Sequence, residues 1–212
     1  MRIGHAIGAA SAAAALSFSF AAQPAAAADS LEAGVITGFD AATGPGLPRA
    51  VTYDQAKMPL GAKVTFKERS ANAGASQFEL SLEGALPGHT YGVHAHRLPC
   101  GANPDDSGAH YQNVPDPRQP STDPVYANPA NEVWLDLTTD ATGAGKSATQ
   151  VAWQIRPDEA RSLVFHEQAT ATDAGRAGTA GARVACVSVR FAPVFGAVSW
   201  PRPWPPLASL HD

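Results

Sequence analysis

The chain has 212 residues, a formal net charge of −4 and 44% hydrophobic residues, which suits one domain with extensions and a buried core. The acidic balance argues against a nucleic-acid partner, because sequence-independent binding needs a basic face. Frequent glycine (19) and proline (18) favour turns and short strands over long helices. Two cysteines are too few for a disulfide-dense scaffold and enough for one bridge.

Residues 1–28 have the order of regions that is typical of a secretory signal peptide. Arg2 supplies the positive charge, an Ala-rich apolar stretch follows over residues 7–22, and small residues at 25–28 form a cleavage site. The alternatives are a buried Ala-rich helix and a membrane anchor, for which the apolar run is short. We therefore predict cleavage near Ala28, a secreted or extracytoplasmic location and no transmembrane segment.

The remaining chain divides into three expected segments. Residues 29–60 are expected to form an irregular N-terminal leader that adds at most one strand. Residues 61–191 carry the repeated strand patterns and are expected to form the folded domain. Residues 192–212 hold five prolines and two tryptophans, which indicates an extended tail without a core of its own.

Alternating apolar and polar residues predict strands through the domain. Residues 62–67 and 78–83 show this period of two on either side of a polar turn, which indicates a hairpin with one buried face. Further strands are expected at residues 90–97, 133–137, 147–156, 162–166 and 183–191. The fold class is therefore all-β: a Greek-key barrel or sandwich of about eight antiparallel strands with long loops.

Four histidines carry the chemical signal. His94 and His96 are two residues apart in a predicted strand, so their side chains share one face and can offer two nitrogens to a metal. His110 lies in the long Pro-rich loop 98–130, and His166 ends a predicted strand. The alternative for the first pair is ordinary packed or exposed histidines without a ligand.

The two cysteines are placed where a bridge would support this site. Cys100 follows His96 by four residues, and Cys186 lies in the last predicted strand. Export would place both in an oxidising compartment, where a disulfide persists. A bridge would attach the loop that carries His110 to the strands, and the alternative is two buried free thiols.

Several segments resemble the copper–zinc superoxide dismutase family, in the same order along the chain. The copper-binding half is similar to residues 92–96 with Cys100 and to residues 107–113. Residues 138–143 resemble the central hairpin of the family, and residues 164–167 resemble the segment with its last copper ligand. Residues 178–186 resemble its C-terminal signature. The resemblance covers about residues 60–191 and implies a Greek-key fold.

This resemblance implies copper-dependent dismutation of superoxide to O₂ and hydrogen peroxide. It matches the copper ligands to His94, His96, His110 and His166. It matches the family disulfide to Cys100 and Cys186, and the arginine that guides superoxide to Arg183. His110 is also expected to take up and return a proton, and superoxide is the expected small-molecule substrate.

The zinc site of the family has no counterpart here. In the family, the third histidine bridges copper to zinc, and two more histidines with an aspartate complete the zinc site. No histidine lies between Tyr111 and Trp134, and Val133 stands where the zinc aspartate would be. The pattern resembles the copper-only branch, in which a carboxylate holds the outer nitrogen of that histidine. Glu132 is the first candidate for this role at His110 and Asp136 the second, with ordinary solvent-facing charges as the alternative; zinc is not expected.

Two other functions stay open from the sequence. The first is a non-catalytic copper-binding or copper-buffering protein with the same fold, against which Arg183 argues. The second is a zinc hydratase or hydrolase that uses three of the histidines and an open water position. The sequence favours no particular oligomeric state.

Overall fold

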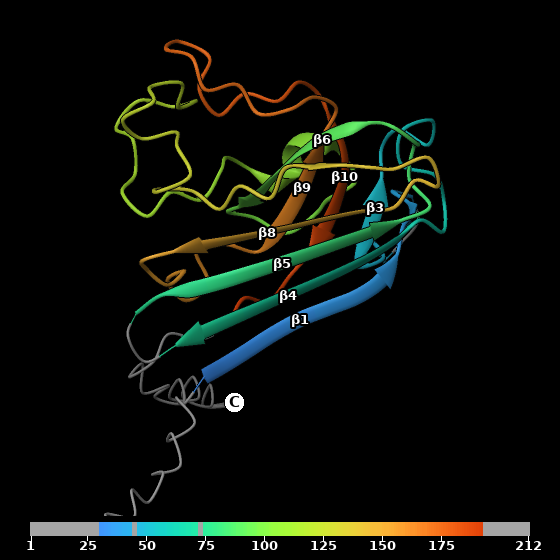
Figure 1. The fold of residues 1–212 in the computed structure, drawn as a ribbon, viewed down its shortest axis with the longest axis horizontal. Helices are drawn as coiled ribbons and strands as arrows, with labels where there is room; N and C mark the ends of the chain where they lie inside the picture. The colour runs from blue at the N-terminus through green and yellow to red at the C-terminus, as the bar shows by residue number, and fades with distance from the viewer. Residues whose placement is uncertain (1–29, 44–45, 72–73, 193–212) are drawn as a thin grey trace, which may run out of the picture.

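A computed structural model describes residues 30–43, 46–71 and 74–192 of the protein (Figure 1). The predicted signal peptide and residues 193–212 of the predicted tail lie outside the described residues. Among the residues that are described, no helix is both long and apolar enough to cross a membrane.

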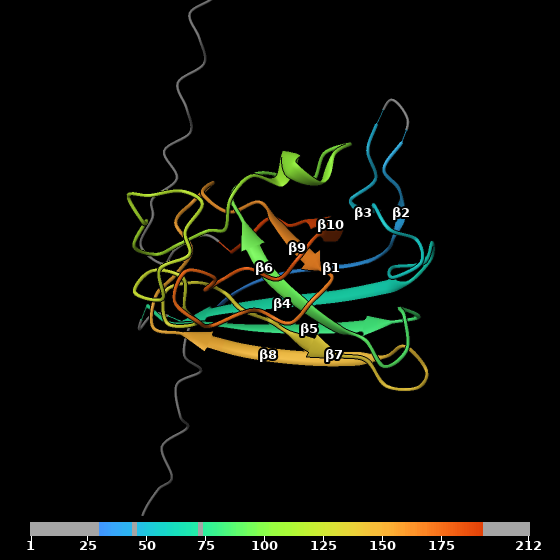
Figure 2. The ribbon, with the colours of Figure 1, turned by 90° about the horizontal axis from the view of Figure 1, so that it is seen from above.

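The strands form two sheets that pack face to face (Figure 1, Figure 2). The four-stranded sheet is antiparallel throughout and has the order β1 (Ser30–Gly38), β4 (Lys63–Ala71), β5 (Ser76–Glu83) and β8 (Gly145–Val151). The six-stranded sheet has the order β2 (Asp40–Ala41), β3 (Ala50–Thr52), β10 (Arg183–Ser188), β9 (Ser162–His166), β6 (Thr90–His96) and β7 (Leu137–Thr138). Within the described residues, the one helix is a short 3₁₀ helix, η1 (Pro104–Ser107).

The expected all-β class is confirmed, in its sandwich form: the sheets are not closed into a barrel. The predicted hairpin is β4–β5, where Val64 pairs with Leu82 and Phe66 with Leu80. Every second residue of β5 is buried and its neighbours are exposed or half-exposed. The alternation works because one face of this sheet packs on the core and the other meets solvent.

The segment expected to be an irregular leader, residues 29–60, contains three strands in the described part. β1 pairs with β4 along its whole length, from Ser30 with Ala71 to Gly38 with Lys63. In the middle of β1, Val35 is buried and the next residue, Ile36, is exposed, so two adjacent apolar residues stand where an alternating pattern would be expected. Gly34 is required there, because a Cβ would lie 2.9 Å from the carbonyl oxygen of Phe66.

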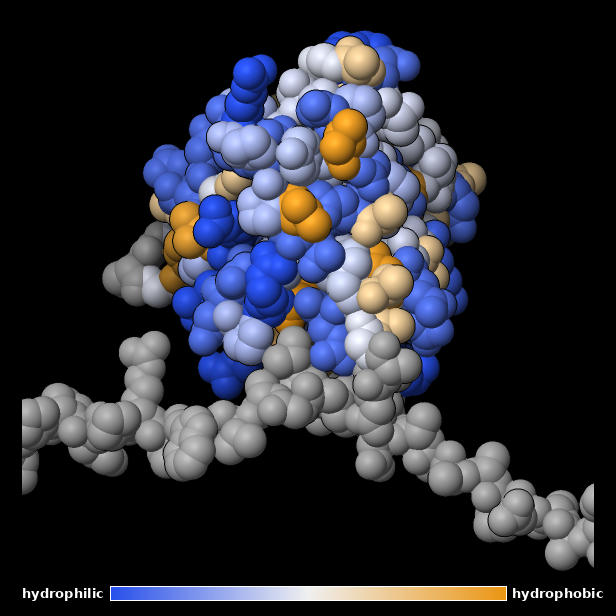
Figure 3. All heavy atoms as spheres, turned by 90° about the vertical axis from the view of Figure 1, so that its left-hand side faces the viewer, coloured by the Kyte–Doolittle hydropathy of each residue, from blue (hydrophilic) through white to orange (hydrophobic). Residues whose placement is uncertain are grey.

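The core between the sheets is aromatic and aliphatic. Phe165 of β9 meets Phe39 edge to face at 5.6 Å and Tyr91 of β6 at 6.4 Å between ring centroids. Such aromatic pairs stabilise the folded state beyond the contribution from the burial of their surface area. On the outer surface, apolar side chains stand apart among polar ones in the face that Figure 3 shows, which is normal for a folded domain.

Strand β6 is buried on both faces, and this positions the histidines. Its residues Tyr91, Val93 and Ala95 point into the core. The alternate residues His94 and His96 point to the other face, where loops cover them. Two of these loops, residues 98–131 and 167–182, lie side by side at one end of the sandwich (Figure 1, Figure 2), where the Gly175 amide donates to the Thr122 carbonyl at 3.2 Å.

Cys100 and Cys186 form a disulfide, so the bridge rather than the pair of free thiols is present. Cys186 is fully buried in β10, and Val51 and Val164 pack around the bridge. The disulfide therefore ties the start of the long loop to the second sheet.

One buried carboxyl lies far from the histidines. Glu68 of β4 points inward and is 1% exposed, where it accepts hydrogen bonds from the Ala192 amide at 2.6 Å and the Ser70 hydroxyl at 3.2 Å. Burial raises the pKa of Glu68 to about 7. Because the folded pKa lies above the unfolded one, Glu68 costs stability progressively as the pH rises from its usual pKa through about 7.

Replacing Glu68 with glutamine is therefore expected to stabilise the protein at high pH and to change little at low pH. The gain at about pH 8 should be on the order of 3 kcal/mol, as the size of the pKa shift implies. Urea unfolding at about pH 4 and about pH 8 measures it. Glu79→Gln, on the exposed face of β5, is the control, and an equal gain at both pH values for Glu68→Gln would contradict the explanation.

Candidate metal centre

The four histidines come together on one face of the second sheet. His94 and His96 lie on β6 and His166 at the end of β9, and these two strands pair antiparallel with His166 opposite Gly92. His110 is brought in by an isolated β-bridge to His96. One ligand nitrogen from each ring lies within 4.8 Å of the others.

The ring nitrogens that face one another are well defined. His94 Nδ1 lies 3.1 Å from His110 Nε2, and His96 Nε2 lies 3.4 Å from His166 Nε2. His94 and His96 are fully buried and His166 is nearly so, whereas the side chain of His110 is 20% exposed. The cluster is therefore enclosed except at His110.

Backbone carbonyls fix two of the rings. His96 Nδ1 lies 2.9 Å from the Gly108 carbonyl oxygen, and His166 Nδ1 lies 3.3 Å from that of Gly181. A carbonyl only accepts hydrogen bonds, so Nδ1 carries the hydrogen in both rings. Their Nε2 lone pairs then point into the cluster, as a metal ligand requires.

His94 is held through a threonine. Its Nε2 lies 2.7 Å from the hydroxyl of Thr170, and that hydroxyl donates to Asp136 at 2.8 Å. Asp136 also accepts the amides of Thr170 and Val93, at 2.8 and 3.2 Å. The direct distance from His94 to Asp136, 3.8 Å, is too long for a hydrogen bond. Asp136, the second candidate partner of His110, is thus placed beside His94 and not beside His110.

The outer nitrogen of His110 faces a carboxylate. His110 Nδ1 lies 2.9 Å from Glu132 Oε2, and the side chain of Glu132 is 2% exposed. The structure therefore places the first candidate partner at hydrogen-bonding distance. Val133, where the zinc aspartate of the family would stand, is a fully buried core residue that offers no ligand.

Burial keeps the enclosed imidazoles neutral. Desolvation, with the neighbouring histidines as a lesser cause, lowers the pKa of His94 and His96 well below the usual value, and lowers that of His166 to about 3. Neutral rings keep the lone pairs that a metal needs. Four imidazole nitrogens without a carboxylate or thiolate in the cluster suit copper, so the residues present fit that ion.

A cavity of about 510 Å³ opens beside the cluster. It is lined by His110, His166, Gln119, Thr179 and Arg183, among others. His110 is the one member of the cluster that is partly exposed. A small anion that enters the cavity therefore meets two of the clustered histidines and a guanidinium.

Arg183 is anchored at the wall of this cavity. Its Nη1 donates to the Pro104 carbonyl at 3.0 Å and to the Ser107 hydroxyl at 2.9 Å, both in η1. Burial lowers the pKa of Arg183, with Asp105 and Tyr53 opposing, and an arginine still stays charged.

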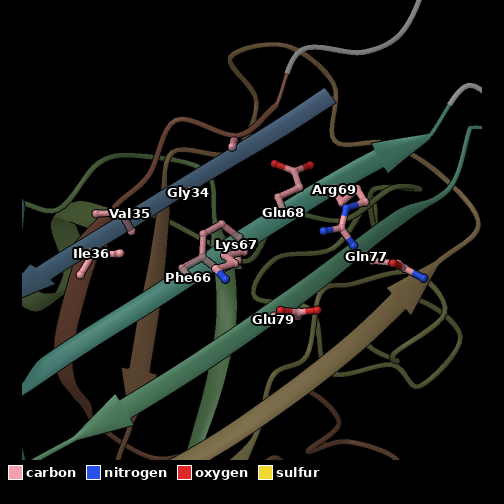
Figure 4. Close-up of a pocket in the computed structure, with 10 residues that line it drawn as sticks. Gly34, Val35, Ile36, Phe66, Lys67, Glu68, Arg69, Gln77 and Glu79 are labelled. Atoms are coloured by element: carbon pink, nitrogen blue, oxygen red, sulfur yellow. The ribbon is translucent and has the colours of Figure 1, made fainter. Parts of the chain in front are cut away.

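A second hollow lies on the outer face of the first sheet (Figure 4). It occupies the gap that Gly34 leaves in β1, beside Ile36, Lys67 and Glu79. None of the four histidines lines it. It therefore has no part in the metal site.

Sequence reasoning missed Thr170, Trp134 and Gln112. Thr170 and Trp134 reach the histidines only through tertiary structure: Thr170 from the Gly-rich loop and Trp134 by an isolated β-bridge to His94. No periodic pattern marks either position. A search for polar residues near the predicted ligands would have found Gln112, two residues after His110.

Thr170→Val is expected to weaken copper binding about 10–100-fold, the usual cost of losing the hydrogen-bond partner of a ligand. Valine has the same shape and leaves His94 Nε2 without its partner. A competition titration with a copper chelator measures the loss. Thr65→Val, on the half-exposed outer face of β4, is the control, and equal affinities for the two variants would show that Thr170 does not hold His94.

A scan against protein-family models and a search of curated proteins find no match to the chain. Among solved structures, a double mutant of a SOD-like protein from Bacillus subtilis is 18% identical, with 61% of this chain and 91% of that chain covered and a TM-score of 0.47. A single mutant of the same protein is also 18% identical, with 68% and 98% covered and a TM-score of 0.46. The clock protein EA4 is 14% identical, with 80% and 98% covered and a TM-score of 0.49. The chain is similar to these proteins, but identities this low and superpositions this partial carry no function over to it.

Proposed function

We propose that this protein is a copper-dependent superoxide dismutase that works without zinc. The observation that carries the proposal is the set of four imidazole nitrogens within 4.8 Å of one another, beside a cavity that Arg183 lines. The fit to copper comes from the ligand type and number. When bound, copper supplies a one-electron redox couple that takes an electron from one superoxide and gives it to another.

The chain's residues supply rigid ligands. His96 and His166 are oriented by backbone carbonyls, and His94 by Thr170. These partners fix each ring and its hydrogen before any metal arrives, which favours binding. Glu132 does the same at His110, in the place where the copper–zinc family has its second metal.

Arg183 is the residue that attracts and orients the substrate. The net charge of the chain is negative, so a distant anion is not drawn to the protein as a whole. A guanidinium held at the cavity wall acts within about one Debye length, near 8 Å at physiological salt. Its hydrogen bonds to η1 hold it at the wall of the cavity that His110 and His166 also line.

Dismutation of two superoxide ions consumes two protons and yields one O₂ and one hydrogen peroxide. His110 is the ligand best placed to pass one of these protons, because it is the most exposed of the four and lines the cavity. Its Nε2 faces the cluster and its Nδ1 is bonded to Glu132. The second proton comes from solvent through the same cavity.

The disulfide fits an extracytoplasmic location, where such bonds persist. Cleavage near Ala28 and export remain predictions from the sequence. N-terminal sequencing of the secreted protein would test them, since an intact N-terminus in the exported protein would contradict the predicted cleavage.

The test of the function is metal analysis combined with a superoxide-decay assay on the disulfide-intact protein. One copper per chain, no zinc and copper-dependent decay would support the proposal. Copper without decay would mean a non-catalytic copper-binding protein. Stoichiometric zinc would overturn the copper-only part of the proposal and favour a hydrolase or hydratase.

A further inference from the structure

Both oxygens of Glu132 are occupied by donors besides His110. The indole Nε1 of Trp134 donates to Oε2 at 2.7 Å, and the amide Nε2 of Gln112 donates to Oε1 at 2.7 Å. Glu132 is 1% exposed, so water does not replace these partners. The carboxylate that faces His110 is therefore held from two sides.

The direction of these hydrogen bonds is fixed by chemistry. An indole nitrogen can only donate. The side-chain oxygen of Gln112 accepts the backbone amide of Asp116 at 2.9 Å, and that amide can also only donate. The Gln112 amide is thus oriented with its nitrogen toward Glu132, and both oxygens of Glu132 must act as acceptors.

We infer that Trp134 and Gln112 are positioning residues of the metal centre: they hold Glu132 as an acceptor and so place the hydrogen of His110 on Nδ1. His110 Nε2 then keeps its lone pair and points at His94 Nδ1, 3.1 Å away.

The contacts of Trp134 show how it is itself fixed. Its backbone forms a bridge with His94, and the two rings lie 5.8 Å apart between centroids. Trp134 therefore links the partner of one ligand to the strand that carries another. Gln112 makes the corresponding link to the long loop, through Asp116 and through Gln119 at 3.4 Å.

The inference depends on the proposed function only through metal binding, so it is tested first on the metal-free protein. Long-range ¹H–¹⁵N NMR of the histidine rings reports which nitrogen of His110 carries the hydrogen. The variants are Trp134→Phe, Gln112→Met and the two combined. Trp153→Phe is the matched control, because it removes the same kind of indole N–H donor, which here donates to the Ala130 carbonyl at 2.8 Å and not to Glu132.

The wild type and Trp153→Phe should show His110 with its hydrogen on Nδ1. The double variant should show a mixture of both tautomers, and its copper affinity in a chelator competition should fall about 10–100-fold. A wild-type His110 with its hydrogen on Nε2 would overturn the inference, and so would a double variant with unchanged tautomer and affinity. A wild type with the expected tautomer but no superoxide decay would leave this inference standing and reject the proposed function.

Discussion

Reversing the charge at Arg183 is expected to slow superoxide decay by a factor of about 10–1,000, the range by which electrostatic steering alters association rates. Arg183→Glu would place a negative charge in the cavity that His110 and His166 line. The net charge of the chain is already negative, so its overall field does not attract superoxide in place of Arg183. Pulse radiolysis of the copper-loaded variant measures the rate.

Three controls distinguish a loss of anion guidance by Arg183 from damage to the fold. Arg183→Lys keeps the charge and should keep most of the rate, because both bonds to η1 come from one guanidinium nitrogen and an ammonium also has N–H groups for two acceptors. Arg161→Glu reverses the same charge at an exposed position just before β9 and should change little. Added salt should slow the wild type and not Arg183→Glu. An unchanged rate in Arg183→Glu, with normal copper content, would show that Arg183 does not guide the anion.

Removing the disulfide should cost about 4–5 kcal/mol of unfolding free energy in the chain-entropy model, less any strain that is relieved. The bridge joins residues separated by 86 positions, so its loss frees a large part of the unfolded chain. The test is urea unfolding of the Cys100→Ser/Cys186→Ser double variant against the wild type. Chemically reduced wild type is the control for the two new hydroxyl groups.

The same double variant should also show a slower superoxide decay per bound copper than the wild type. Cys100 lies just before η1, which holds the guanidinium of Arg183 through Pro104 and Ser107. A released loop would therefore loosen Arg183 while the ligands on β6 and β9 stay in place. A double variant with wild-type stability would contradict the expected cost, and full activity per bound copper would contradict the link to Arg183.

The sequence was informative where structure is local. The spacing of His94 and His96 predicts a shared strand face, and the alternation in β4 and β5 predicts their hairpin, because both follow from the period of a strand. The bounds of β9 were also predicted correctly, as residues 162–166. His110 and His166 were further candidates from the sequence, and their assignment with the first pair to one copper site came from the family resemblance.

Features that depend on tertiary packing were not predictable in this way. The strands β1 to β3 lie in a segment without a regular alternation of apolar and polar residues, and β1 and β3 are formed by pairing with β4 and β10, which are distant in sequence. Asp136 was predicted as a possible partner of His110, yet its partner is Thr170, 34 residues later. Such a contact follows from how two loops cover one sheet, and no pattern along the chain encodes it.

The most direct test of the account is the rate of superoxide decay by pulse radiolysis at a series of copper loadings, with zinc measured in each sample. We predict a rate that rises in proportion to bound copper, stops rising at one copper per chain and needs no zinc. A rate that does not depend on copper, or that appears only when zinc is bound as well, would contradict it.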